Sequence, residues 1–193
     1  MLFTGIMLTP DGPKVLEYNA RFGDPETQTM MMLLAPECDL AAVLLACCAG
    51  TLDAVSIPVR PGFACNVVVA AGGYPESYPK GDVITLGECP EGGCLHSRGQ
   101  CCELKLTGGI ILGVQVFHAG TERSSSGELT TAGGRVLSVA AYGTRLQEAV
   151  ASAYKGVERV RFSGMFYRKD IAKRYDCARM HVLGIANRCP KGS

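Results

Sequence analysis

The stretch LEYNARFGDPETQ, from Leu16 to Gln28, concentrates polar side chains in a chain whose residues are 47% hydrophobic. It begins in a run typical of a β-strand and ends in residues that favour a helix. Side chains alternate along a strand, so Glu17 and Asn19 are expected on one face and Tyr18 on the other. The stretch therefore predicts a strand, a turn and a helix, with polar groups gathered at their junction.

The segments on either side of this junction predict a hairpin and a helix. Two β-rich runs, Leu2–Thr9 and Lys14–Asn19, are separated by the turn sequence PDGP. Asp24 is expected to be the N-cap of a helix over Pro25–Ala35, because aspartate caps well and proline suits the first turn. This helix is expected to stop before Pro36.

A second helix is predicted through LAAVLLACCA, residues 40–49. Asp39 is placed to cap its start, and Gly50 lies where a left-handed residue commonly ends a helix. Because both helices are rich in apolar residues, we expect both to be mostly buried, with Met30–Met32 in core packing.

The residue pattern changes near Val55–Gly62, after which the sequence consists of short β-rich runs separated by glycine. Thr144-x-x-Gln147 predicts a capping box, followed by a helix and a strand at Val160–Phe162. One face of that helix is apolar: Leu146, Ala149, Val150, Ala153 and Val157. ERSSSGE, residues 122–128, is interpreted as a solvated hairpin turn. The fold class is α+β: a hairpin with two helices, then a small β-rich domain with one main helix.

Charge and cysteine usage narrow the class of protein. The chain has 19 Lys and Arg against 18 Asp and Glu, a net charge of +1, which argues against nucleic acid or an anionic membrane as a partner. Its apolar runs are too short to span a bilayer, and we expect a cytosolic protein. The ten cysteines lack a disulfide-like spacing and are expected to be reduced. A zinc site or incidental loop cysteines could explain one cluster: Cys89, Cys94, His96, Cys101 and Cys102.

The junction itself suggests chemistry. A carboxylate and an amide oxygen on one strand face, Glu17 and Asn19, suit a hard cation such as Mg²⁺. Arg21 could bind a phosphate or carboxylate through two parallel hydrogen bonds. The alternative is a strand end whose polar residues merely cap the following helix, and the spacing alone leaves both interpretations open.

The whole string EYNARFGDPETQ closely resembles the signature of the phosphoribosylamine–glycine ligase family, also called glycinamide ribonucleotide synthetase, whose members are ATP-grasp enzymes. LTPDGPKVLEYN resembles the hairpin that leads into this signature. Further blocks resemble the family's C-terminal domain in the right order: GGYPESYPKGDVI, VFHAGT, TAGGRVLSVAAYG and FSGMFYRKDIA. The resemblance runs from about Met1 to Arg174 with one interruption.

The resemblance implies a ligase of purine biosynthesis that uses ATP to join glycine to 5-phosphoribosylamine through a glycyl phosphate. It implies Mg²⁺ or Mn²⁺ as the cofactor, with Glu17 and Asn19 at the metal-ligand positions. Arg21 and Asp24 are implied as catalytic substrate anchors, Arg21 for a carboxylate or phosphate and Asp24 for an ammonium group. In animals the family's ligase is often one unit of a multifunctional purine enzyme, so a larger polypeptide is a possible setting.

The resemblance also implies a domain division. Residues 1–57 correspond to the end of the ATP-grasp domain and residues 58–174 to the C-terminal domain, with 175–193 an unstructured tail. The segment around the cysteine cluster is longer than the family pattern and is interpreted as a surface-loop insertion. Family members also have an N-terminal α/β domain and nucleotide-binding lysines that this sequence lacks, so we expect the chain alone to be inactive. The alternative is a truncated isoform that acts as a non-catalytic interaction module.

Four other residues are weighed individually. Arg135 follows a glycine turn of the kind that approaches a phosphate and is a substrate-binding candidate on that ground, the alternative being a turn that serves the geometry of the chain alone. Arg168 and Lys169 either bind the ribose phosphate or pair with Asp170 at the surface. His118 is more readily explained as a satisfied histidine at a strand end than as a substrate contact.

Overall fold

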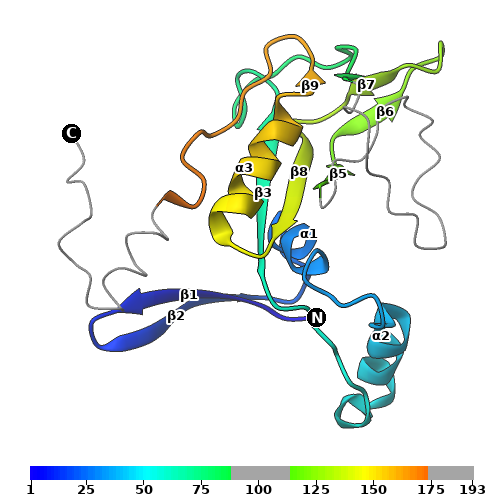
Figure 1. Ribbon diagram of the computed structural model, residues 1–193. Helices are drawn as coiled ribbons and strands as arrows, with labels where there is room; N and C mark the ends of the chain where they lie inside the picture. The colour runs from blue at the N-terminus through cyan, green and yellow to red at the C-terminus, as the bar shows by residue number, and fades with distance from the viewer. Residues whose placement is uncertain (88–113, 174–193) are drawn as a thin grey trace.

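The computed structural model describes residues 1–87 and 114–173 (Figure 1). An N-terminal hairpin and two helices precede a three-stranded sheet that carries one longer helix. The elements in chain order are β1 Phe3–Thr9, β2 Gly12–Asn19, α1 Glu26–Met31, α2 Leu40–Ala49, the 3-10 turn η1 Leu52–Ala54, β3 Phe63–Ala70, β4 Thr85–Leu86, β5 Val114–His118, β6 Thr121–Arg123, β7 Leu129–Thr131, β8 Arg135–Gly143, α3 Leu146–Val157 and β9 Val160–Arg161. The α+β prediction is confirmed.

The predicted hairpin forms from β1 and β2. Their antiparallel pairing runs from Phe3 opposite Asn19 to Thr9 opposite Gly12, with an irregularity after Gly5. Gly12 adopts φ +95° in the turn, a conformation that a side chain would strain. Among the described strands, β1 and β2 pair only with each other.

Helix α1 is shorter than predicted. It covers Glu26–Met31 rather than Pro25–Ala35, because the backbone of the residues that follow bonds to a distant segment. The Ala35 N–H donates to the carbonyl of Pro58 (3.0 Å), and the Arg60 N–H donates to the carbonyl of Leu33 (2.9 Å). This pairing takes the chain out of the helix well before Pro36.

The N-cap expected from Asp24 is wrong. Pro25, joined to Asp24 by a cis peptide bond, occupies the N-cap position, and no side chain caps the helix. The Asp24 carboxylate instead accepts a hydrogen bond from Gln28 and pairs with Arg135. Tertiary partners therefore replace the local capping interaction.

Helix α2 has the predicted bounds and caps, but its expected burial is wrong. The Asp39 carboxylate accepts from the Ala42 N–H (3.0 Å), and Gly50 is left-handed with φ 70°. Only Val43 and Ala46 are buried, and α1 has no buried residue. Met30, expected in the core, is 59% exposed. No other part of the described chain covers the outer sides of these helices.

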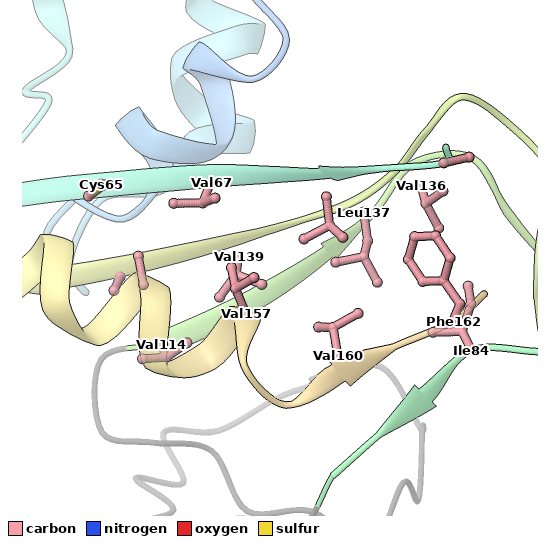
Figure 2. Packing of buried hydrophobic residues seen from close by; sticks show 14 of the residues in the cluster. Cys65, Val67, Ile84, Val114, Val136, Leu137, Val139, Val157, Val160 and Phe162 are labelled. Carbon is pink, nitrogen blue, oxygen red and sulfur yellow. The ribbon is translucent and has the colours of Figure 1, made fainter. Parts of the chain in front are cut away.

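The core belongs to the second part of the chain. Strand β8 lies between β3 and β5 in an antiparallel sheet, and α3 packs on one face of it. Figure 2 shows Val67 of β3, Val139 of β8 and Val157 of α3 directed into the space between sheet and helix. All three are fully buried. Burial also raises the pKa of the Cys65 thiol, on the same face of β3, to about 11.

Two small ribbons complete this part, β4 with β9 and β6 with β7. The turn between β6 and β7 contains Ser124–Glu128, closed by backbone and hydroxyl hydrogen bonds, as predicted for ERSSSGE.

The four described cysteines are free thiols: Cys38, Cys47, Cys48 and Cys65. No helix within residues 1–87 and 114–173 has the length and apolar character needed to cross a bilayer.

Helix α3 begins one residue later than the predicted capping box. Arg145 is the N-cap, and its N–H donates to Glu148 (3.2 Å) rather than to Gln147. The Thr144 hydroxyl donates to the same carboxylate (2.7 Å), and these hydrogen bonds lower the pKa of Glu148. The predicted apolar face is largely right, since Ala149, Ala153 and Val157 are buried.

Gly156 allows α3 to lie close to the sheet. A Cβ atom there would be 2.6 Å from Cγ1 of Val139 and 2.9 Å from Cγ1 of Val114. Gly156→Ala should therefore lower the free energy of unfolding by about 1–3 kcal/mol through overpacking. This loss opposes the gain of about 1 kcal/mol expected from helix propensity. Urea denaturation followed by circular dichroism measures the change.

Ala151→Gly, at an exposed position of the same helix, calibrates the propensity effect alone and should cost about 1 kcal/mol. A Gly156→Ala variant as stable as the original chain, or more stable, would contradict the close packing of α3 on β5 and β8.

Candidate functional site

The polar stretch from Leu16 to Gln28 lies where the hairpin, α1 and the sheet meet (Figure 1). Gly23 is buried at this point, and a Cβ atom there would be 2.7 Å from Oε2 of Glu26 and 3.1 Å from the ring of Phe3. A residue larger than glycine would therefore push the turn away from the hairpin. Helix α1 packs against β3 and β8, on the sheet that carries α3.

Arg135 joins this turn to the second part of the chain. Its Nη2 lies 3.3 Å from Oδ2 of Asp24, and its Nη1 donates to the Asp24 carbonyl (3.1 Å). The two side chains are 42% and 45% exposed, so water screens the ion pair. Gln28 donates from Nε2 to the other carboxylate oxygen of Asp24 (3.2 Å). The structure thus brings together two predicted site residues, Asp24 and Arg135.

The two glycines before Arg135 let this strand end approach its neighbours. A Cβ atom on Gly134 would be 2.2 Å from the ring of Tyr74 and 2.9 Å from that of Tyr78. Gly133 lies against Gly120 at a similarly short distance. The predicted glycine turn is therefore a close-packed junction that fixes where β8 and Arg135 begin.

Two residues of this junction were missed by the sequence analysis. Asn66 on β3 donates from Nδ2 to the Pro25 carbonyl (3.2 Å), which also accepts from the Thr29 hydroxyl. Asn66 Oδ1 and Gln28 Oε1 are buried without a hydrogen-bond partner. Such oxygens are suited to accept from a bound N–H group or water. Asn66 could have been noticed as the one amide in the apolar run FACNVVVAA.

Glu17 and Asn19 lie at the end of β2, separated by Tyr18 and so on the same strand face. Neither side chain has a hydrogen bond or ion pair with the rest of the described chain, and Asn19 Nδ2 is buried without a partner. The Glu17 carboxylate and Asn19 Oδ1 are the oxygens of this pair that suit a hard divalent cation, whereas the unpartnered Asn19 Nδ2 is a donor and suits an acceptor such as a substrate oxygen. These two residues could therefore hold such a cation, with water and substrate oxygens as further ligands.

The remaining predicted site residues lie at the surface. Arg21 donates from Nη1 to the Phe22 carbonyl (2.9 Å) and is exposed. Arg168 binds both carboxylate oxygens of Asp170 (2.9 and 2.7 Å), which lowers the pKa of Asp170 and raises that of Arg168. Lys169 is exposed beside this pair. No described contact joins Arg168 or Lys169 to the Asp24 turn.

His118 ends β5, and its Nδ1 lies 3.2 Å from the Thr121 hydroxyl. Partial burial, together with the nearby charge of Arg123, lowers its pKa. This agrees with a satisfied strand-end histidine.

Within the described ranges, no group of three or more His, Cys, Asp or Glu side chains could hold a metal ion. The cysteine cluster considered for zinc, in the predicted insertion, lies outside those ranges, as does the predicted tail.

Comparison with known families matches two parts of the chain. The family described as "Phosphoribosylglycinamide synthetase, C domain" matches residues 64–174. The one described as "Phosphoribosylglycinamide synthetase, ATP-grasp (A) domain" matches residues 1–27. The first match covers more than half of the chain, and the second ends within the polar stretch.

Individual proteins agree with these matches. The bifunctional purine biosynthetic protein ADE1 of Schizosaccharomyces pombe is 48% identical over 172 residues, which are 89% of this chain and 19% of that protein. A phosphoribosylamine–glycine ligase of Synechocystis is 46% identical over 176 residues, 90% of this chain and 37% of that protein. The chain thus spans between about a fifth and just over a third of the length of these relatives.

Solved structures give the same picture of the fold. A phosphoribosylamine–glycine ligase of Thermotoga maritima is similar with a TM-score of 0.61 and 36% identity, covering 88% of this chain and 36% of that one. The biotin carboxylase domain of Hydrogenobacter thermophilus 2-oxoglutarate carboxylase has a TM-score of 0.50 at 17% identity, covering 86% and 35%. The second likeness concerns the fold alone.

The Asp24 and Arg135 side chains allow a direct test of how strongly they interact. A double-mutant cycle with Asp24→Asn and Arg135→Gln should give a coupling free energy of about 0.5 kcal/mol at low salt, because both groups are half exposed. The coupling should vanish near about 1 M salt, where the Debye length is about 3 Å. Thermal unfolding of the four proteins measures it.

The matched control replaces Asp24→Asn by Glu26→Gln, which removes an exposed carboxylate two residues away. This cycle should show no coupling to Arg135 at either salt concentration. A coupling between Asp24 and Arg135 that persists at high salt would mean that the pair is more deeply buried than described.

Proposed function

Because the chain belongs to the phosphoribosylglycinamide synthetase family, we propose that it supplies the end of the ATP-grasp domain and the C domain of a phosphoribosylamine–glycine ligase. The observation that carries this proposal is the presence of both family matches, in order, on one chain. The relatives matched along about 90% of the chain include proteins named as this ligase, which does not favour a purely non-catalytic interaction module. We place the boundary between these two domains at residue 57 and the end of the C domain at residue 174 as part of this proposal.

The reaction proposed for the assembled ligase has two steps. The glycine carboxylate attacks the γ-phosphorus of ATP, and ADP leaves as glycyl phosphate forms. The amine of 5-phosphoribosylamine then attacks the glycyl carbonyl, the C–O bond to phosphate breaks, and the amine loses a proton. The products are glycinamide ribonucleotide, ADP and phosphate. Bifunctional purine proteins among the relatives support a setting in a larger purine-biosynthetic polypeptide.

Glu17 and Asn19 are the residues we propose as ligands of a divalent cation, Mg²⁺ or Mn²⁺. A cation bound there would supply positive charge to the phosphoryl group in transfer. The pair lies at the end of the hairpin that the ATP-grasp family matches, and neither side chain has a hydrogen bond or ion pair with another described residue. Both residues lie on β2 with one residue between them, so their side chains leave the strand on the same face.

Arg21 and Asp24 follow as proposed substrate anchors. Arg21 is exposed and offers a guanidinium to a substrate carboxylate or phosphate. The Asp24 carboxylate already accepts from Gln28 and pairs with Arg135. Because a carboxylate offers about four acceptor positions, an ammonium group can still bind it. The buried free oxygens of Gln28 and Asn66 lie in the same junction and would add acceptors for that group.

Three further cations are proposed as binders of the substrate phosphate. Arg135 supports this role best, because Asp24 and the glycine turn orient it beside the signature. Arg168 would have to exchange the two hydrogen bonds it makes to Asp170 for bonds to phosphate. Lys169, exposed next to it, is the weaker candidate.

Metal binding by Glu17 and Asn19 can be measured on this chain with Mn²⁺ as a spectroscopic probe. Two protein oxygens bind a divalent ion weakly, so we expect a dissociation constant in the range of about 1 mM. Glu17→Gln combined with Asn19→Ala should abolish this binding in electron paramagnetic resonance titrations, and Mg²⁺ should compete. Glu26→Gln is the control and should bind Mn²⁺ unchanged; equal binding by all variants would exclude the proposed ligands.

The chain alone should bind Mg-ATP only in the millimolar range or more weakly. Arg21 is the cation that follows the proposed metal ligands along the chain, and an exposed charge contact contributes only about 1 kcal/mol. Calorimetric titration with Mg-ATP tests the binding. An assay of ADP release dependent on glycine and 5-phosphoribosylamine tests activity. Micromolar binding, or turnover above that of Glu17→Gln, would show that the chain carries a complete nucleotide site.

A further inference from the structure

The face of the sheet opposite α3 carries buried polar side chains. Side chains alternate along β3 and β8, and Val67 and Val139 pack toward α3. Asn66 and Ser138, one position earlier on each strand, therefore face the other way. Ser138 is only 5% exposed, and its hydroxyl oxygen is buried without a hydrogen-bond partner in the described structure. Buried polar groups are almost always paired, so this hydroxyl points to a bound partner.

The strand register brings Ser138 close to Asn66. Ser138 lies opposite Val68 in the antiparallel pairing of β8 with β3. Asn66 lies opposite Ala140, two positions away on each strand. The two polar residues are therefore diagonal neighbours on one face, a relationship in which backbones are about 7–8 Å apart and side chains are closer. Oδ1 of Asn66 is also buried without a partner, so one small molecule between the two side chains can bond to both.

Helix α1 adds a third polar group above this pair. Nδ2 of Asn66 donates to the carbonyl of Pro25 at the start of the helix (3.2 Å), and α1 also contacts β8. Three residues later, Gln28 donates from Nε2 to the Asp24 carboxylate (3.2 Å). Because both side-chain amides already donate from nitrogen, their oxygens are left as buried acceptors. We call Ser138, Asn66 and Gln28 the covered polar site.

The hydrogen-bonding capacity of the covered polar site selects its ligand. The two amide oxygens can only accept, whereas the Ser138 hydroxyl can donate. A ligand that satisfies all three groups must therefore donate two protons and accept one. Water does so, and buried water molecules typically make about three hydrogen bonds. An ammonium ion has no acceptor for the hydroxyl proton, and Arg135, paired with Asp24 beside the site, disfavours a second cation there.

We propose that the covered polar site binds one water molecule, which bridges the sheet to α1 and holds Gln28 in the orientation that bonds Asp24. The water donates to the two amide oxygens and accepts from Ser138. Ser138 is thus a positioning residue that acts on the Asp24 carboxylate without touching it. The inference goes beyond the proposed function and concerns the chain itself. In an assembled ligase, the substrate ammonium group considered above would have to displace this water to reach the amide oxygens.

Magnetization transfer from water to side-chain amide protons tests the site in the full, isotope-labelled chain. We expect nuclear Overhauser cross peaks with the sign of a slowly exchanging water at the side-chain amides of Asn66 and Gln28. Rotating-frame spectra separate this transfer from proton exchange. The exposed amide of Gln147 should give only the signature of fast surface hydration.

Two substitutions of Ser138 separate a bound water from the hydroxyl proton itself. In Ser138→Ala the cross peaks should persist, because the water keeps its bonds to the two amide oxygens. In Ser138→Val they should be lost, because the added methyl groups fill the space that the water needs. Ser163→Val, the same change at an exposed position, should leave them unchanged.

A double-mutant cycle provides a second measurement that does not require Ser138→Val to fold. Ser138 and Gln28 have no direct hydrogen bond, so only a bridge couples their polar groups. With Ser138→Ala and Gln28→Met, the double variant should be less destabilised than the product of the two single effects on the unfolding constant, by at least about twofold. The matched cycle of Ser138→Ala with Glu26→Gln, an exposed residue of the same turn, should be multiplicative. Urea denaturation measures both cycles.

The proposal fails on any of four results. These are no slow-water cross peak at the two amides of the original chain, loss of the cross peaks in Ser138→Ala, their persistence in a folded Ser138→Val, and multiplicative effects of Ser138→Ala and Gln28→Met. Cross peaks that arise from added ammonium chloride instead of water would assign the site to a cation and overturn it as well. None of these measurements uses glycine, 5-phosphoribosylamine or ATP, so they leave the proposed ligase function to its own tests.

Discussion

The antiparallel pairing of β3 with β8 forms a sheet with two faces, and both α3 and α1 pack on this sheet. On one face Val67 and Val139 meet α3, and burial of these side chains supplies the core. The opposite face receives α1, and Asn66 bonds there to the carbonyl of Pro25. The same sheet therefore both stabilises the second part of the chain and positions the polar turn of the first.

Features fixed by neighbouring residues were predictable from the sequence. The hairpin, the Asp39 cap and the Gly50 end of α2 depend on interactions within a few positions, and all three are confirmed. Asp24 precedes a helix and is a residue type that commonly caps one. Its carboxylate instead binds Arg135 and Gln28, so it does not cap α1. Helix α1 ends early for a similar reason, because segment 33–35 pairs with segment 58–60. Long-range partners decided each of these errors.

The apolar character of the two N-terminal helices predicted that their side chains would be buried, but it did not predict which part of the molecule would pack against them. The apolar helices were expected to be buried, yet Leu45 and Met30 are largely exposed. An apolar residue type does not by itself identify the surface that packs against it. The candidate site shows the same division. Alternation placed Glu17 and Asn19 on one face. Asn66 stands out in the sequence as an isolated amide, but its bond to the Pro25 carbonyl depends on the packing of α1 against β3. A strand amide carries no sequence signal of the carbonyl it will bond.

The contact between Arg135 and Asp24 spans 111 residues of sequence. At a synthesis rate of about 5–20 residues per second, Arg135 is therefore made about 6–22 s after Asp24. Contacts of such long range are slow to form because loop closure is costly in entropy. The geometry of the polar turn therefore depends on a residue that is made long after the turn itself.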